Sequence, residues 1–255
     1  MKNALLAGAV LLAVPMLACA QTDDNEWSGS GEAGFALTSG NTKSQNLNAK
    51  FALKKEDVQW KHKFFLNALR SKGESNGEYD LTANRYDIGA SSGYKFDERS
   101  YLVGAARYEN DDFSTYKYQW IVSLGYGYTF IKNAQTEFSA EVGPGYRRQD
   151  KRGYSVTSGE PPVTTFIDPD VEGSVVGRGL ISFKHKFNDS TSFENTTLIE
   201  AGSDNTFVQN DAGLAVSMSE KLALKLGYQV RNNSKVNPGT KKTDQLLTTN
   251  LVFKF

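Results

Sequence analysis

The feature that most constrains the fold is an alternation of apolar and polar residues that recurs along almost the whole chain. From Tyr118 to Phe130, for example, every second residue is apolar, and those between are mostly polar or glycine. Successive side chains of a β-strand point to opposite faces, so such a stretch is predicted to be a strand with one apolar face. Twelve stretches follow the pattern, at residues 27–38, 44–54, 58–70, 81–96, 100–109, 116–130, 136–148, 173–187, 191–202, 206–218, 222–232 and 243–255. An even number of antiparallel strands can close into a barrel with both termini on one side.

The connections between these segments alternate in length, which is an independent constraint. Short polar turns follow the second, fourth, sixth, eighth and tenth segments, whereas longer loops follow the third, fifth, seventh and eleventh. The longest loop spans residues 149–173, and the connections after the first and ninth segments are short. Outer-membrane barrels combine short periplasmic turns with longer extracellular loops, and a soluble sandwich has no reason to do so. The sequence therefore predicts an all-β fold, a transmembrane antiparallel up-and-down β-barrel of about 12 strands formed by residues 21–255.

The polar face of the predicted strands carries charged residues of both signs, several of them in mid-strand. In a membrane barrel the apolar face meets lipid and the polar face lines the lumen, whereas a soluble barrel has the opposite arrangement. We predict that these residues line the lumen: Glu32, Lys50, Arg85, Asp87, Arg107, Glu141, Arg147, Arg178, Lys184, Glu200, Lys225 and Arg231. Alternation alone leaves an ordinary secreted β protein as the alternative.

Aromatic residues gather on the apolar face close to the short turns. Tyr128 and Phe130 are one example, and the last predicted strand ends on Phe255. Aromatic rings settle at the boundary between membrane and water, so this distribution predicts an aromatic girdle. Pro144 is the one proline inside a predicted strand. Since it cannot donate to a strand ladder, we expect a bulge or a local break there.

The N-terminus has the pattern of a secretory signal. Lys2 provides a short positive region, residues 4–20 are apolar, and the small residues at 18–20 fit cleavage after Ala20. Residues 1–20 are therefore predicted to be a cleaved signal peptide. An uncleaved membrane helix and a lipoprotein processed at Cys19 are the alternatives. Cys19 is the only cysteine, so cleavage after Ala20 leaves a mature chain without disulfides or thiolate metal ligands.

Charge and histidine content argue against several classes of function. The chain has 29 basic and 29 acidic residues, so no basic excess points to nucleic acid. His62 and His185 share a face with aromatic residues near the predicted turns, which favours an interfacial position over a metal or catalytic site. Neither stands beside a serine as a hydrolase triad requires, so we predict no enzyme, catalytic residue, cofactor or metal site. A hydrolase built on carboxylate pairs such as Glu137 and Glu141 is the alternative left open.

Three stretches resemble a bacterial family, the salt-induced outer-membrane proteins, whose function is undefined. They are "WSGSGEAGFALTSGNTKSQNLNAKFAL" at 27–53, "EVGPGYR" at 141–147 and "TDQLLTTNLVFKF" at 243–255. Trp27, Gly29, Gly34 and the turn at 38–42 carry the similarity in the first of them. The resemblance implies an outer-membrane β-barrel of Gram-negative bacteria, with no established substrate and no catalytic residues. The loop 149–173 departs from the family pattern as an insertion, so any role of that loop is the least transferable.

Two functions are compatible with these patterns. The first is a narrow passive channel for ions or small hydrophilic solutes, because the lumen is charged and the barrel is wider than eight-stranded ones. The alternative is a non-conducting structural or surface-interaction barrel. In that case charges such as Arg85, Asp87, Arg107 and Glu109 pair across neighbouring strands and plug the lumen, and the loop 149–173 binds a partner.

The chain ends on an alternating strand, with Leu251, Phe253 and Phe255 on its apolar face. This pattern resembles the C-terminal signal that the barrel-assembly machinery reads in outer-membrane proteins, so these residues are predicted to form an assembly signal. The expected partners are outer-membrane lipid, that machinery during biogenesis and a small hydrophilic solute. The expected location is the cell outer membrane of a Gram-negative bacterium.

Overall fold

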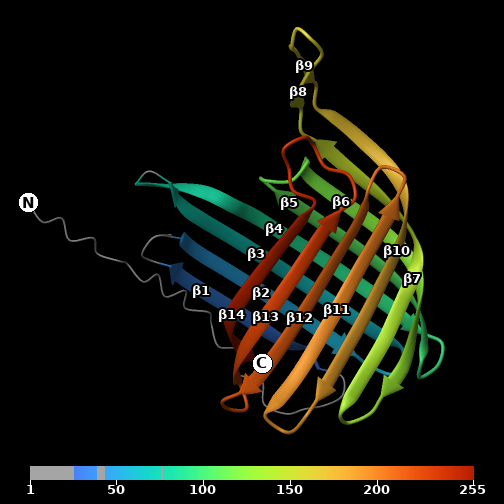
Figure 1. The fold of residues 1–255 in the computed structure, drawn as a ribbon. Coiled ribbons are helices and arrows are strands. Elements are labelled where there is room, and N and C mark those ends of the chain that lie inside the picture. The colour runs from blue at the N-terminus through green and yellow to red at the C-terminus, as the bar shows by residue number, and fades with distance from the viewer. Residues whose placement is uncertain (1–25, 39–43, 76) are drawn as a thin grey trace, which may run out of the picture.

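Twelve strands close into one antiparallel barrel in the computed structural model, which describes residues 26–38, 44–75 and 77–255 (Figure 1). The barrel strands are β1 (Ser28–Thr38), β2 (Ser44–Glu56), β3 (Trp60–Ser75), β4 (Glu78–Lys95), β5 (Ser100–Asp111), β6 (Tyr116–Lys132), β7 (Thr136–Lys151), β10 (Asp170–Lys186), β11 (Thr191–Gly202), β12 (Thr206–Ser217), β13 (Leu222–Asn233) and β14 (Thr243–Lys254). Each pairs with the next barrel strand along the chain, and β14 closes the circle on β1. The predicted fold class is confirmed.

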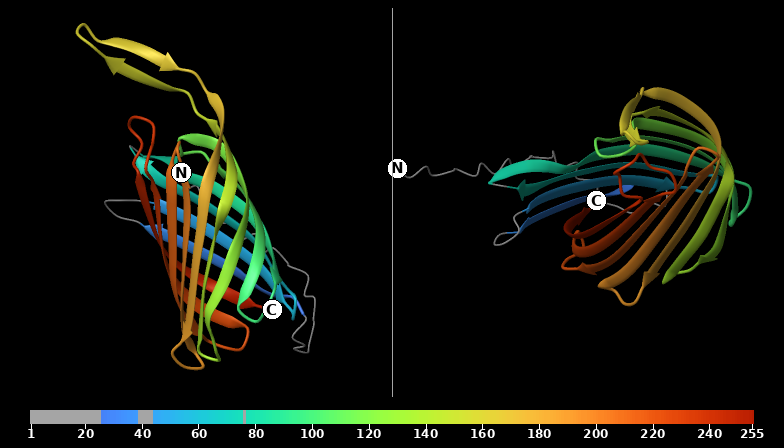
Figure 2. Two further views of the ribbon diagram at one scale, coloured as in Figure 1. Left: turned by 90° about the vertical axis from the view of Figure 1, so that its right-hand side faces the viewer. Right: turned by 45° about the horizontal axis from the view of Figure 1, so that its top comes forward.

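Two strands were not predicted. β8 (Tyr154–Ser158) and β9 (Val163–Ile167) form a separate hairpin within the predicted loop 149–173, and this hairpin projects beyond the barrel (Figures 1 and 2). β3 and β4 also continue past the barrel wall, so the loop expected after the third segment is largely an extension of these two strands. Where both faces of a strand meet water, no apolar face is required, and the alternation that reveals a strand is lost.

Four of the five short turns share one side-chain device. In each, a side-chain Oδ1 accepts hydrogen bonds of 2.7–3.0 Å from the backbone N–H groups two and three residues ahead, at Asp57, Asp97, Asn133 and Asn188. The N–H groups that Asp57 binds, above all that of Trp60, hold the pKa of its carboxyl below the usual value. Such local bonds make a tight turn stable without a long loop. We call this end of the barrel the turn end, and the opposite end the loop end.

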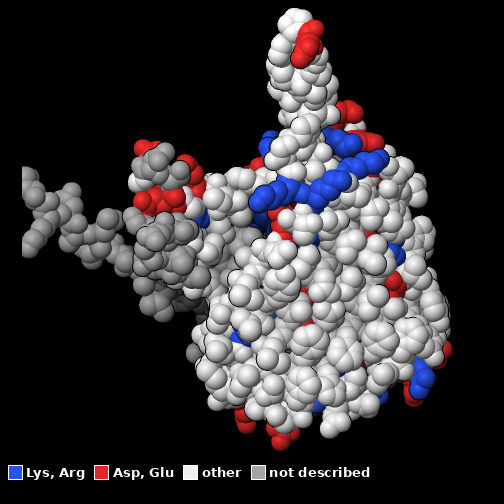
Figure 3. Space-filling view, viewed as in Figure 1, with Lys and Arg blue, Asp and Glu red and all other residues white. Residues whose placement is uncertain are grey.

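The outer wall of the barrel is apolar, and its charged residues face inward. Val142, Val175 and Leu247 are 68%, 72% and 68% exposed, whereas the inward residues Glu109 and Arg147 are 1% and 0% exposed. Figure 3 shows a wall that is mostly free of charge, with Lys, Arg, Asp and Glu gathered toward its two ends. A soluble protein buries its apolar side chains, so this inverted arrangement is that of a barrel surrounded by lipid.

Aromatic rings form bands on the outer wall near both ends. At the turn end the ring centre of Phe138 lies 5.1 Å from that of Phe130 and 6.3 Å from that of Phe183, which links β6, β7 and β10. At the loop end the ring of Tyr108 lies 6.1 Å from that of Tyr86 and 6.1 Å from that of Tyr118. Two aromatic bands with an apolar wall between them mark the two interfaces of a membrane barrel.

The sequence predicts a bulge or a local break at Pro144, and the structure has a local break without a bulge. β7 keeps one register with β10 across Pro144, and its register with β6 is the same before and after it. The ladder with β6 lacks the pairs at Gly143 and Pro144, which is the expected local break. A Cβ on Gly143 would lie 2.2 Å from the carbonyl oxygen of Leu124, so the two strands approach too closely for a side chain there.

The seam between the first and last strands is held by a short ladder. Residues 30–33 of β1 pair with residues 251–254 of β14. Beyond them, Gly29 N donates to the carbonyl of Phe255 at 2.7 Å, and Phe255 N donates to the carbonyl of Gly29 at 3.0 Å. Leu251, Phe253 and Phe255, the predicted assembly signal, are exposed on the outer wall at the turn end. The ring of Phe255 covers Gly29, where a Cβ would lie 2.6 Å from it.

The predicted signal peptide, its cleavage site after Ala20 and Cys19 lie in residues 1–25, outside the described residues. In the stretches that are described, no helix has the length and apolar character needed to cross a membrane.

Candidate functional site

The strand registers place all twelve predicted lumen-lining residues on the inward face of the barrel. Glu32 stands opposite Lys50 in the β1–β2 ladder, and Arg178 stands opposite Glu200 in the β10–β11 ladder. The others have the inward parity of their strands: Arg85, Asp87, Arg107, Glu141, Arg147, Lys184, Lys225 and Arg231. The structure divides these residues between a tightly packed group at the loop end and a more open lumen toward the turn end.

Five inward residues form an ion-pair cluster near the loop end, which we call the loop-end cluster. It consists of Arg107, Glu109 and Asp111 on β5, Glu200 on β11 and Arg231 on β13. Arg107 pairs with Glu109 on its own strand and with Glu200, for which the Nη2–Oε2 distance is 2.6 Å. Arg231 pairs with Glu109 and lies 3.4 Å from Asp111. Glu109 therefore serves two arginines at once.

The loop-end cluster crosses the lumen from wall to wall. β5 and β13 stand on opposite sides of the barrel, because β6, β7, β10, β11 and β12 separate them one way and β4, β3, β2, β1 and β14 the other. The pair of Arg231 and Glu109 thus bridges the full width. The expected pairing across neighbouring strands is wrong here. Asp87 and Glu109 stand opposite each other in the β4–β5 ladder and carry like charges, so they do not form an ion pair. The partners of Glu109 are Arg107 on the same strand and Arg231 on β13.

Aromatic and amide side chains hold the loop-end cluster in place. The guanidinium carbons of Arg107 and Arg231 lie 5.4 and 5.0 Å from the ring centre of Phe207, within the range of cation–π attraction. Tyr116 Oη donates to Glu109 Oε1 at 2.8 Å, and Gln119 Nε2 donates to Tyr116 Oη at 2.9 Å. Such a network fixes each charge in a single geometry.

The loop-end cluster excludes water from this part of the lumen. Glu109 and Glu200 are each 1% exposed, and Arg231 is 4% exposed. Burying charges is costly unless they are paired and hydrogen-bonded, and most of the polar atoms here meet that condition. The Nε atoms of Arg107 and Arg231 are among the few buried polar atoms of the described residues that lack a hydrogen-bond partner. The cluster is therefore a tightly packed barrier in which a few buried polar atoms lack hydrogen-bond partners.

Two connections cover the loop-end cluster from outside. In the β11–β12 connection, Asp204 Oδ1 accepts a 2.5 Å hydrogen bond from Arg147, which is fully buried. The β13–β14 loop reaches other connections, because Asn237 N donates to Thr115 Oγ1 at 3.3 Å and Asn237 Nδ2 donates to the carbonyl of Arg152 at 3.4 Å. Figure 2 shows this loop lying over the loop end of the barrel. The barrel is closed on this side.

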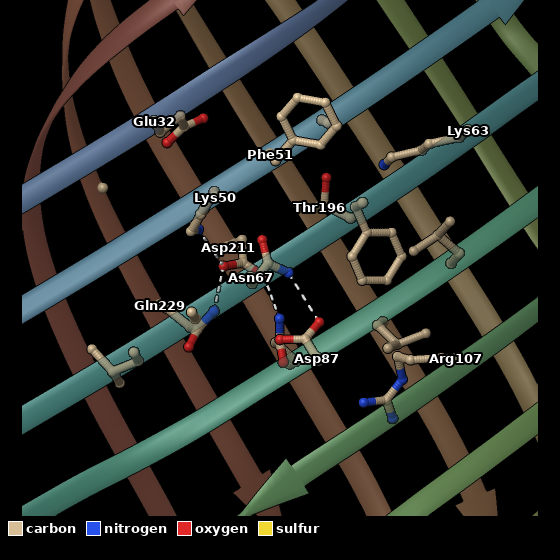
Figure 4. Close-up of a pocket in the computed structure, with 18 of the residues that line it drawn as sticks. Glu32, Lys50, Phe51, Lys63, Asn67, Asp87, Arg107, Thr196, Asp211 and Gln229 are labelled. Atoms are coloured by element: carbon tan, nitrogen blue, oxygen red, sulfur yellow. Dashed lines mark hydrogen bonds and ion pairs between the residues drawn. The ribbon is translucent and has the colours of Figure 1, made fainter. Parts of the chain in front are cut away.

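Below the loop-end cluster the lumen holds a cavity of about 270 Å³. Several of its charges are paired: Lys50 Nζ lies 3.5 Å from Asp211 Oδ1, and Lys225 Nζ lies 2.7 Å from Glu32 Oε1. Figure 4 shows the contact of Lys50 with Asp211 and shows Lys63, another lining residue, with no hydrogen bond or ion pair to the other residues drawn. A polar cavity of this size holds several water molecules.

Two predicted lumen residues are held by amide side chains. Arg85 Nη2 donates to Gln229 Oε1 at 2.7 Å, which is a second contact across the lumen. Asn67 Nδ2 donates to Asp87 Oδ2 at 2.9 Å. These hydrogen bonds leave Arg85 and Asp87 without an ion-pair partner within 4 Å among the described residues.

Toward the turn end the lumen remains open to water. Arg178 Nη1 lies 3.2 Å from Glu141 Oε2, and Tyr101 Oη donates to Glu141 Oε1 at 3.2 Å. The inward lysines Lys63 and Lys184 are nevertheless exposed, in contrast to the buried charges of the loop-end cluster. The barrel is thus a polar cup that opens at the turn end and is closed at the loop end.

Sequence reasoning missed the residues that hold the closure together. Phe207 and Tyr116 are aromatic, yet they face the lumen, and Glu109 was named only as a partner for neighbouring strands. A signal for Phe207 exists, because it shares the strand parity of the polar residues Gln209 and Asp211 and so breaks the alternation of its segment. An aromatic residue on the polar face predicts packing inside the lumen.

The two histidines lie on the outer wall. The ring of His62 stacks on that of Trp60 at 5.7 Å, and His185 Nδ1 lies 2.8 Å from Thr136 Oγ1. Each sits next to aromatic residues of the turn-end band. Across the described stretches, no group of three or more His, Cys, Asp or Glu residues is arranged to hold a metal ion.

The chain matches a protein family over most of its length. A family model described as "Protein of unknown function, DUF481" matches residues 31–255. The uncharacterized protein YdiY of Escherichia coli (strain K12) is 26% identical over 202 residues, which cover 79% of this chain and 72% of YdiY. These matches bear out the resemblance to a bacterial family without an assigned function.

Solved barrels show a distant likeness. The translocator domain of the autotransporter NalP from Neisseria meningitidis has 12% identity and a TM-score of 0.47, and the alignment covers 90% of this chain and 86% of that one. An outer membrane channel from Pseudomonas putida F1 has 11% identity and a TM-score of 0.47, with 93% and 100% covered. The NanC porin has 11% identity and a TM-score of 0.47, with 90% and 98% covered.

Proposed function

We propose, for a chain that belongs to the DUF481 family of proteins of unknown function, that it is a narrow passive channel for ions or small hydrophilic solutes. In this structure the lumen is closed at the loop end. The observation that carries this proposal is a polar, water-accessible lumen that ends at the loop-end cluster. Rings of charged side chains act as ion selectivity filters in other channels.

The proposed location is the outer membrane of a Gram-negative bacterium. A barrel whose wall is apolar and banded by aromatic rings is suited to lipid, and outer-membrane barrels place their short turns in the periplasm. In that orientation the cup opens toward the periplasm and the loop-end cluster faces the cell exterior. The proposal assigns no catalytic residue and no cofactor, and it includes the barrel-assembly machinery as the partner during biogenesis.

The test is conductance in a planar lipid bilayer, with the wild-type chain compared with a variant that removes the barrier. We expect the wild type to remain near the background of the lipid. Replacing Arg107, Glu109, Glu200 and Arg231 together by alanine removes two charges of each sign, so no net charge is introduced. This variant is expected to give discrete current steps, because water and ions can then pass between the cavity and the loop end.

A matched control replaces Asp168, Asp170, Lys241 and Lys242 by alanine. These four residues also carry two charges of each sign at the loop end, but their side chains are exposed and outside the loop-end cluster. The control is expected to behave as the wild type. A four-alanine barrier variant that folds, as judged by its heat-dependent gel mobility, yet conducts no better than the control would rule out the channel proposal.

A second candidate function is surface interaction, and the β8–β9 hairpin favours it. The hairpin stands away from the barrel as its own two-stranded sheet, and its β9 strand is exposed along its whole length. Val163 and Phe166 are 61% and 59% exposed, so the hairpin offers apolar side chains and unpaired strand edges to a partner.

Excision of residues 153–168 tests this second function. The shortened chain is expected to fold and reach the membrane, because the hairpin contributes no strand to the barrel. Cells that express the wild-type chain should differ in aggregation or surface adhesion from cells that express the excised variant. Equal behaviour of the two cell types would count against surface interaction and leave the channel proposal unaffected.

A further inference from the structure

Three inward lysines at the turn end form no ion pair with any described residue. Lys54 on β2 and Lys63 on β3 stand directly opposite each other in the ladder, and both side chains point into the lumen. Lys184, on β10, interacts electrostatically with Lys54. All three side chains are exposed to the lumen, and within the described ranges none has an ion pair or a hydrogen bond. We call these residues the lysine triad.

Nearby carboxylates do not neutralise the lysine triad. Glu194, which stands opposite Lys184 in the β10–β11 ladder, is bound by Lys225. Glu56, at the end of β2, is held at 2.6 and 2.7 Å by two lysines outside the triad. Glu141, a carboxylate near Lys63, is paired with Arg178. Glu137 stands opposite Lys184 in the β7–β10 ladder and forms no ion pair with it. The turn-end mouth of the lumen therefore has an excess of positive charge.

This arrangement is unfavourable for the empty barrel. Like charges that face each other directly across a strand pair destabilise the sheet, and Lys54 and Lys63 do so without a carboxylate between them. Elsewhere in the same lumen several cations are paired with carboxylates, as Lys225 is with Glu32. A local violation of the pattern that a chain otherwise follows is typical of a functional position.

We propose that the lysine triad binds a small anion with two or more negatively charged oxygens, of the phosphate or dicarboxylate class. Each ammonium group offers three donors and a compact charge, which suits such oxygens. The cavity of about 270 Å³ that Lys63 lines gives the anion room, and the open turn end gives it access. The bound anion would replace the repulsion between Lys54 and Lys63 by two attractions.

The site does not depend on conduction. A barrel that never opens at the loop end can still bind an anion at the turn end, so the bilayer experiment and the binding experiment fail independently. If the channel proposal also holds, the lysine triad lies on the path of the solute and would favour anions over cations.

Isothermal titration calorimetry with inorganic pyrophosphate on the detergent-solubilised full chain, at low ionic strength, tests this inference. The wild type is expected to bind pyrophosphate in a saturable manner. Replacing Lys54, Lys63 and Lys184 together by glutamine should weaken binding by about a hundredfold or more, since each charge-assisted contact is worth about tenfold. The control replaces Lys117, Lys241 and Lys242, exposed lysines of the loop end, and should bind as the wild type.

A stability measurement separates a binding site from a merely basic surface. The single variant Lys54→Gln should raise the urea midpoint of the empty barrel, because it removes the repulsion with Lys63, and should reduce the gain that pyrophosphate gives. The inference is overturned if the wild type shows no saturable binding, or if the triple variant binds as well as the loop-end control. It is also overturned if Lys54→Gln lowers the midpoint of the empty barrel.

Discussion

Replacing Glu109 by glutamine is expected to destabilise the barrel by about 3–5 kcal/mol, the usual cost of breaking a buried ion pair by removing one partner. Glu109 is 1% exposed, pairs with Arg107 and Arg231, and accepts a 2.8 Å hydrogen bond from Tyr116. Glutamine keeps the volume but removes the charge, so two guanidinium groups lose the counter-charge that they share in a buried site. The urea midpoint, followed by the fluorescence of the 3 tryptophans in detergent micelles, measures the change.

The matched control for Glu109→Gln is Asp244→Asn. Asp244 is an exposed inward residue at the same end of the barrel, so its substitution should change the free energy of unfolding by less than about 0.5 kcal/mol. The double variant Glu109→Gln with Arg231→Gln should cost less than the sum of the two single variants, because it leaves fewer charges unpaired. Equal midpoints for Glu109→Gln and Asp244→Asn would mean that water reaches the loop-end cluster, and the lumen would then not be closed there.

The barrel was predictable from sequence because lipid and lumen impose opposite demands on adjacent residues. Every strand of the barrel wall, such as β6, therefore alternates apolar and polar residues. This alternation can be recognised in the sequence without knowing which strands lie beside it. The β8–β9 hairpin lies outside this constraint, since water surrounds both of its faces. Its signal is of another kind: the turn-forming residues 159–162 stand between the β-branched runs 154–158 and 163–167.

The sequence predicts which residues face the lumen, but it does not predict which of them contact one another. Parity assigns Arg107 and Arg231 to the inward face, but it does not say how the two walls are staggered. Glu109 and Arg231 are 122 positions apart in sequence, and their contact depends on strand stagger, barrel shape and side-chain length. Such contacts decide whether the lumen is open or closed. The closure at the loop end could therefore be recognised only in the three-dimensional structure.

Deleting Phe255 is expected to impair assembly of the barrel more than any change in a loop. The deletion removes both backbone hydrogen bonds between Phe255 and Gly29, of 2.7 and 3.0 Å, and the ring that covers Gly29 and stacks on Phe51 at 6.0 Å. The β1–β14 seam would lose about 2–4 kcal/mol of stabilisation from these bonds and this ring. A closed barrel has no spare edge, so a weakened seam exposes unpaired strand edges to lipid. The amount of folded, heat-modifiable protein in isolated outer membranes measures the effect.

Two further variants divide this effect between the stability of the seam and recognition in the cell. Phe255→Ala keeps the backbone hydrogen bonds to Gly29 and removes only the ring. If this variant folds normally into lipid vesicles but is depleted from outer membranes, the ring acts as a signal for assembly; if it is depleted in both settings, the ring acts by closing the seam. The excised-hairpin variant, which lacks residues 153–168, serves as the loop change for comparison and should assemble at the wild-type level, because its missing residues form no part of the barrel. Wild-type amounts of folded protein after deletion of Phe255 would show that the four-residue ladder between β1 and β14 closes the barrel without its terminal aromatic residue.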